Sequence, residues 1–168
     1  MDIVGDLMRV AVSGDNLTAL SKSMGIADKV KAQTILRVSL PLVLGTMATT
    51  AAKPGGAEML AKLATQAGGT NPIDNLGGFL SSPTTAGGSA MVSTLFGSQM
   101  DTIQNVIAQK SGLPPATIGK VMAVAVPMVV SYAGKQNISP AGLAQQSKMA
   151  FQASPEADTL FKNLMAIK

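Results

Sequence analysis

The sequence predicts an all-α protein, built as a multihelical, internally duplicated bundle in which proline bends the two central helices. Three observations support this fold. Apolar residues recur at helical spacing along almost the whole chain, and no stretch shows the sustained alternation typical of strands. Two long segments, 38–52 and 121–134, carry no charge, and each contains one proline. A set of short motifs occurs twice in the same order.

Glycine and proline mark the ends of the expected helices. Gly25 is placed to end the second helix in the left-handed conformation, and Asp28 is placed to open the third. Pro115, Pro140 and Pro155 each begin a helix, because the donor that proline lacks would be unpaired there. The expected helices cover residues 3–11, 17–24, 28–52, 57–66, 89–96, 98–110, 115–133, 141–152 and 155–166. Pro72 suits the first turn of a further helix, with a buried end at Phe79 and Leu80.

The chain is expected to form two helical halves that share one core. Its 168 residues are the size of one domain. Residues 81–88 read Ser-Ser-Pro-Thr-Thr-Ala-Gly-Gly, which is typical of a linker or an exposed loop. This segment separates a first half-repeat, residues 1–80, from a second half-repeat, residues 89–168.

The repeat consists of a glycine after a short polar helix end, followed by an apolar helix with a proline in its middle. Gly25 and Pro41 hold these places in the first half, and Gly112 and Pro127 hold them in the second. The proline motifs are Val38-Ser-Leu-Pro41-Leu-Val43 and Val124-Ala-Val-Pro127-Met-Val129. The matching order favours duplication of one ancestral unit.

Two interpretations of Pro41 and Pro127 remain open from the sequence. Each proline either bends one long helix, because it removes a backbone hydrogen bond, or divides two shorter helices. If the halves are duplicates, equivalent positions around the two prolines should be buried alike. These positions are Val38, Leu40 and Leu44 in the first half and Val124, Val126 and Val130 in the second.

Several of these motifs resemble the YidB-like family of bacterial domains of unknown function, also called domain of unknown function 937. The residues that carry the resemblance are Gln109-Lys-Ser-Gly-Leu113, the segment 118–130 around Pro127, and Leu76-Gly-Gly-Phe-Leu80. The resemblance implies an all-helical, internally duplicated fold, and it implies no activity and no catalytic residue. The first half departs from the pattern at Met24 and at the charged residues that follow Gly25.

The composition excludes several kinds of chemistry. The chain has no histidine, cysteine or tryptophan, so disulfides, imidazole or thiolate metal sites, histidine-based triads and cysteine nucleophiles are impossible. The segment from Gly112 to Val121 has the wrong glycine spacing for a phosphate-binding loop. Glu156 and Asp158 are two residues apart and therefore face different sides of a helix. We therefore expect no enzyme activity, no catalytic residues, no metal site and no cofactor.

The favoured function is that of a non-enzymatic structural or interaction protein that associates with itself, as a homo-oligomer or a filament. Only 13% of the residues are charged and 46% are hydrophobic. This composition suggests more apolar surface than one small bundle hides, and interfaces between copies would cover it.

Two alternatives belong to other classes. The net charge of +4 allows a nucleic-acid-binding helical module, with phosphate contacts from Lys22, Lys29, Lys31 and Arg37. A carrier would instead hold an apolar ligand between the two halves, in a cleft lined by Met122, Met128 and Tyr132.

The sequence predicts a cytoplasmic location and no membrane span. The N-terminus carries Asp2 and Asp6 where a signal peptide has positive charge. The two uncharged apolar segments are each shorter than the ~20 residues that a membrane helix needs. Buried core helices are the better interpretation of both segments.

Overall fold

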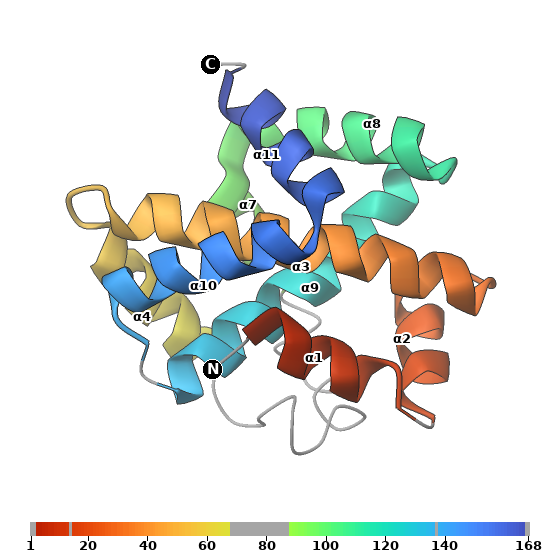
Figure 1. Ribbon diagram of the computed structural model, residues 1–168, viewed down its shortest axis with the longest axis horizontal. Coiled ribbons are helices and arrows are strands. Elements are labelled where there is room, and N and C mark those ends of the chain that lie inside the picture. The colour runs from red at the N-terminus through yellow and green to blue at the C-terminus, as the bar shows by residue number, and fades with distance from the viewer. Residues whose placement is uncertain (1–2, 14, 68–87, 137, 167–168) are drawn as a thin grey trace.

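The computed structural model describes residues 3–13, 15–67, 88–136 and 138–166, which are helical with no strand among them. The predicted all-α class is therefore confirmed (Figure 1). The helices are α1 (Ile3–Ala11), α2 (Asn16–Met24), α3 (Lys29–Ala51), α4 (Gly56–Ala67), α7 (Gly88–Phe96), the 3-10 turn η1 (Gly97–Gln99), α8 (Met100–Ser111), α9 (Pro115–Lys135), α10 (Pro140–Ala153) and α11 (Pro155–Ala166). The predicted linker lies outside the described residues except for Gly88, which begins α7. The helix expected from Pro72 to Leu80, which includes the motif from Leu76, also lies outside them.

The two longest helices, α3 and α9, pack against each other at the centre of the molecule. By length and composition alone, α3 and residues Pro115–Gly134 could each cross a membrane. The other helices cover them, so that 67% of the apolar window of α3 and 72% of that of α9 are buried. The absence of charge from residues 38–51 of α3 and 121–134 of α9 is explained by this central position, since a helical segment covered on all sides is apolar on all sides.

The covering helices cross from one half to the other. Helix α4 follows α3 in the chain but packs more extensively on α9, and α10 follows α9 but packs on α3. Figure 1 shows α10 running beside α3. Helices α7 and α8 also pack on α9, α11 packs on α3, and α1 and α2 contact both central helices. One hydrophobic core therefore joins the two halves.

The two repeat glycines end helices in the same conformation. Gly25 follows α2 with φ +71°, and Gly112 follows α8 with φ +74°. This left-handed region costs glycine little because it has no Cβ. The third helix opens at Asp28 as predicted. Asp28 also caps α3, because its carboxylate accepts hydrogen bonds from the backbone N–H groups of Val30 (2.9 Å) and Lys31 (3.4 Å).

Each of the two prolines in the predicted repeat lies inside a continuous helix of its own. Pro41 is an interior residue of α3, and Pro127 is an interior residue of α9. The interpretation that each proline divides two helices is therefore wrong. The expected burial around them is confirmed, since every one of the six matched positions is at most 8% exposed: Val38, Leu40, Leu44, Val124, Val126 and Val130.

Candidate functional site

A pocket of about 390 Å³ opens between the two halves, where the ends of α3 and α9 meet α4 and the start of α10. We call it the inter-half pocket. Its walls are mainly aliphatic, and the two polar side chains that line it are the hydroxyls of Thr65 and Ser131. The lining residues are Met47, Ala51, Ala57, Leu60, Ala61, Ala64, Thr65, Val130, Ser131, Ala133, Gly134, Ile138, Pro140 and Leu143.

Small side chains on α4 and α9 leave this space unfilled. Ala57, Ala61 and Ala64 follow one another at helical spacing on the face of α4 that lines the pocket. Gly134 brings α9 so close to α4 that a Cβ atom there would lie 2.8 Å from the Cβ of Ala64. The two helices touch at this point, and no large side chain from either helix fills the space beside it.

The three residues predicted to line a carrier cleft lie in the hydrophobic core. Met122 and Met128 are fully buried, and Tyr132 is 6% exposed. The lining of the inter-half pocket consists of other residues, although Tyr132 neighbours Ser131 and Ala133 in α9. The buried methionines fill space among the packed helices, which is a use to which their flexible side chains are suited.

Tyr132 has a polar role at the edge of the core. Its hydroxyl donates a 2.7 Å hydrogen bond to Oδ2 of Asp6, and Oδ1 of Asp6 pairs with Arg9 at 2.8 Å. The backbone N–H of Ile3 donates to Oε1 of Gln146 at 2.9 Å. These bonds tie α1 to the central helix α9 and to α10, which covers the other central helix.

The four basic residues proposed as phosphate contacts are exposed. Lys22 lies in the last turn of α2, and Lys29, Lys31 and Arg37 lie in the first half of α3. A further lysine, Lys120 of α9, extends over Gly25, which lies between α2 and α3, and its Nζ is 3.5 Å from an ideal Cβ position there. The sequence did not indicate Lys120, since its proximity depends on the packing of α2 on α9.

The described part of the chain shows no feature that indicates metal binding or catalysis. It contains no group of three or more His, Cys, Asp or Glu residues that could hold a metal ion. Two buried hydroxyls there, those of Ser21 and Ser39, make no hydrogen bond. Neither serine lines the inter-half pocket.

A family model for a bacterial protein of unknown function, DUF937, matches residues 6–136, which is well over half of the chain. The chain belongs to this family. The resemblance found in the sequence is thereby confirmed. The DUF937 match begins in α1 and extends through α9, whereas α10 and α11 follow it. No curated protein matches the chain, and no solved structure does.

Proposed function

We propose that this DUF937 protein is a non-enzymatic binding protein that holds a small apolar ligand in the inter-half pocket. The observation that supports the proposal is the pocket itself, with about 390 Å³ of space and an aliphatic lining. Binding sites for small molecules are concave, of this size and mostly apolar, with few polar groups to orient the ligand. The lining has two hydroxyl groups: that of Thr65, which donates a 3.0 Å hydrogen bond to the carbonyl of Ala61, and that of Ser131.

The character of the lining favours binding over catalysis. None of the described lining residues carries a titratable side chain, so the pocket offers no general acid, base or charged nucleophile. Apolar walls instead favour the transfer of an aliphatic group out of water, at about 25 cal/mol for each Å² of apolar surface removed. The ligand class that fits is an uncharged or weakly polar aliphatic molecule.

Titration with the uncharged fluorophore N-phenyl-1-naphthylamine tests this proposal. We expect a saturable rise in fluorescence with one site per chain. The variant Ala61→Trp should abolish the rise, because its side chain would fill the pocket. Ala116→Trp is the matched control, since Ala116 is an exposed helical alanine outside the lining. Absence of binding, or equal binding by both variants, would contradict the proposal.

We also propose that the halves arose by duplication and that Pro41 and Pro127 bend their helices. Support comes from the shared order of short helix, left-handed glycine and long proline-containing helix. Further support comes from the reciprocal covering of α9 by α4 and of α3 by α10. An experimental structure in which α1–α4 fails to superpose on α7–α10, or in which either central helix is straight, would contradict this proposal.

Self-association remains a second proposal, as a homo-oligomer or filament. Among the described residues the exposed large apolar side chains are Val12, Val30 and Met149. Because these side chains are few, an interface between copies would bury the open apolar hollows of the surface rather than isolated exposed side chains. Sedimentation over a wide concentration range tests it, and a strict monomer would rule it out. The predicted cytoplasmic location stays a prediction from the sequence.

Nucleic-acid binding is favoured by one specific observation. The basic side chains around the start of α3 make no ion pair within the described part of the chain, whereas Arg9 and Lys162 do. Unpaired exposed cations are available to phosphates. Binding to a DNA duplex should then weaken steeply with salt, and no detectable binding at low salt would exclude this function.

A further inference from the structure

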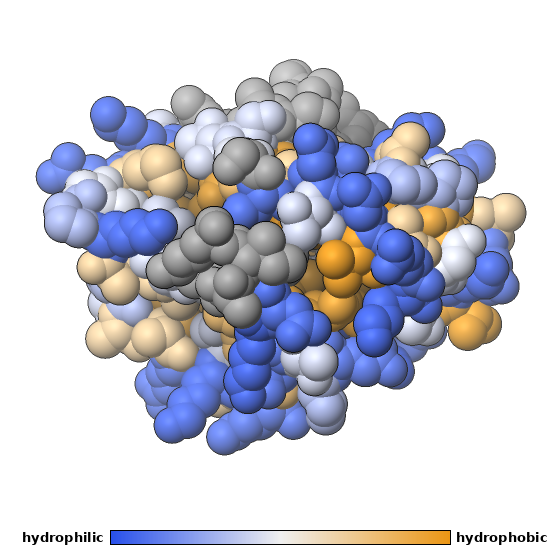
Figure 2. All heavy atoms as spheres, turned by 90° about the horizontal axis from the view of Figure 1, so that it is seen from above, coloured by the Kyte–Doolittle hydropathy of each residue, from blue (hydrophilic) through white to orange (hydrophobic). Residues whose placement is uncertain are grey.

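A second apolar hollow lies on another face of the molecule, between α3, α8 and α11. We call it the three-helix groove. Its volume is about 340 Å³, and it shares no lining residue with the inter-half pocket. Figure 2 looks down on this side, where hydrophobic atoms lie in a hollow bordered by hydrophilic side chains. The lining residues are Thr34, Ile35, Val38, Ile107, Lys110, Ser111, Pro155, Glu156, Thr159 and Leu160.

The floor of the groove is aliphatic and comes from all three helices. Ile35 and Val38 belong to α3, Ile107 to α8 and Leu160 to α11, and all four are buried beneath the rim. No aromatic side chain is among the lining residues. A nucleic-acid base would therefore find no ring on which to stack, whereas an aliphatic side chain would find a matching surface.

The rim has charged groups that are still available for a partner. Its hydroxyls are already used within the chain, since Thr34 donates to the carbonyl of Val30 and Thr159 to that of Pro155. Lys110 and Glu156 both line the groove, yet neither forms an ion pair within the described residues. These two charges are free to pair with another molecule.

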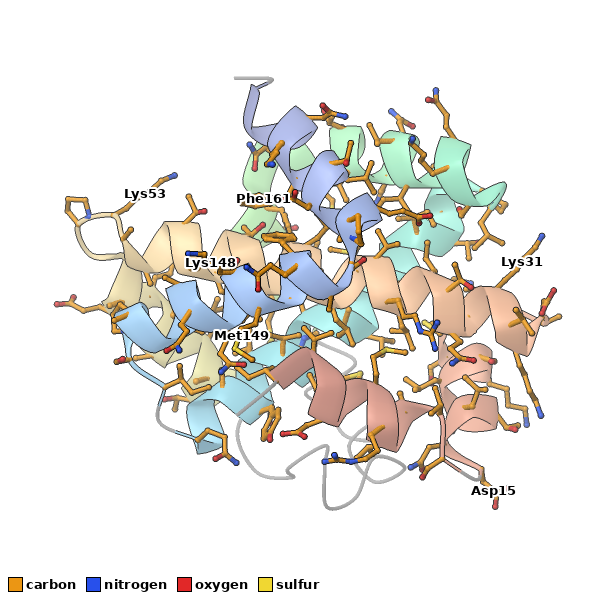
Figure 3. The ribbon with its side chains drawn as sticks, viewed as in Figure 1. Asp15, Lys31, Lys53, Lys148, Met149 and Phe161 are labelled. Carbon is orange, nitrogen blue, oxygen red and sulfur yellow. The ribbon has the colours of Figure 1, made fainter. Side chains whose placement is uncertain are left out.

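Lys31 adds a second positive charge next to this rim. It lies three and four residues before Thr34 and Ile35, so it continues the face of α3 that lines the groove. It is exposed, and Figure 3 shows it at the N-terminal end of α3. Lys31 and Lys110 outweigh Glu156, which gives the groove a positive border.

We propose that the three-helix groove docks an amphipathic helix of a partner protein, with aliphatic residues on one face and acidic residues along its flanks. The aliphatic residues at spacing i, i+3, i+4 and i+7 would lie on the floor, as in other helix-in-groove complexes. The acidic residues would pair with Lys31 and Lys110. Charge complementarity of this kind contributes mainly to the rate of association and to partner choice.

The test uses a synthetic three-turn helix with leucines at that spacing and glutamates elsewhere, labelled for fluorescence anisotropy. We expect saturable binding that weakens as salt rises. The double variant Lys31→Glu/Lys110→Glu should weaken binding by about tenfold, because two attractive contacts become repulsive. Thr34→Trp should abolish binding by filling the groove. All variants should keep the helical circular dichroism of the parent.

Lys53→Glu is the matched control, because Lys53 is an exposed lysine beyond the opposite end of α3 (Figure 3). It should bind the peptide as the parent does. No binding by the parent, or equal loss with Lys53→Glu, would overturn the proposal. The proposal would also be overturned if the protein bound a DNA duplex more tightly than the peptide and Lys31→Glu/Lys110→Glu abolished that binding. A dimer that Thr34→Trp converts to a monomer would overturn it as well. A negative result in the fluorophore titration of the inter-half pocket would leave this docking proposal unaffected.

Discussion

The two central helices are covered in opposite ways. Over α3, Gly45 lies beneath an aromatic pair, and a Cβ atom there would be 2.6 Å from the ring of Phe151 and 3.1 Å from that of Phe161. The two rings are 4.9 Å apart, and Figure 3 shows Phe161 reaching down from α11. Over α9, Gly134 meets only the methyl group of Ala64, and a pocket lies beside the contact. The interface over α3 is thus filled, whereas the interface over α9 has a hollow beside it.

The largest expected effect tests whether α3 and α9 are equally deep in the core. Val43 and Val129 are both fully buried. Val43→Asp and Val129→Asp should each cost more than about 4 kcal/mol of unfolding free energy, or prevent folding, because the carboxylate loses its hydration. Val30→Asp is the control in α3, since Val30 is 71% exposed and its change should stay within about 0.5 kcal/mol. Urea denaturation would measure all three, and a mild effect at either valine would remove that helix from the core.

A smaller effect distinguishes the filled interface from the hollow one. Gly45→Ala should cost about 1–3 kcal/mol by overpacking against Phe151. Phe151→Leu in the same chain should recover part of that loss. Gly134→Ala should cost less, because α4 can shift into the neighbouring pocket. Thermal unfolding of the three variants checks this order, and a larger loss at Gly134 would show that the hollow side is the rigid one.

The attachment of α1 to α9 gives the next prediction. Tyr132→Phe removes the hydroxyl that donates to Asp6, and a hydrogen bond to a charged group is worth about 1.5 kcal/mol or more. Asp6→Asn should weaken the same bond. A double-mutant cycle in urea would measure the coupling, and additive losses would mean that this bond does not stabilise the fold.

The smallest effect concerns the start of α3, which has a side-chain cap, whereas α9 begins after Pro114 without one. Asp28→Ala should cost about 1 kcal/mol, because two backbone donors lose their acceptor. Asp15→Ala is the control, since Asp15 precedes α2 without making a side-chain cap. The midpoints of urea unfolding would measure both changes, and equal midpoints for the two variants would show that the cap of α3 does not stabilise the fold.

Local signals predicted much of the fold. The helical spacing, the terminal glycines and the start of the third helix at Asp28 depend on a few neighbouring residues, and the structure has them as expected. Burial around Pro41 and Pro127 followed from the absence of charge, because an uncharged helix has no side suited to water.

The inter-half pocket could not be predicted in the same way. Met122 and Met128, which were predicted to line a cleft, are buried instead, because large flexible side chains fill a core, whereas a pocket forms where side chains are too small. Ala57, Ala61 and Ala64 were the available signal, as a stripe of small residues on one helix face. The signal becomes meaningful only with the knowledge that α4 crosses to α9, which is a contact between residues distant in the chain.

The exchange of α4 and α10 between the two central helices also has a kinetic consequence. Because α10 covers α3, the first half cannot complete its interior until the second has been synthesised and has docked. Contacts between distant segments raise the contact order and slow folding relative to bundles whose neighbours in sequence pair first. We therefore expect the chain to fold more slowly than simple helical hairpins of its size. We also expect an isolated half to remain an open, aggregation-prone intermediate.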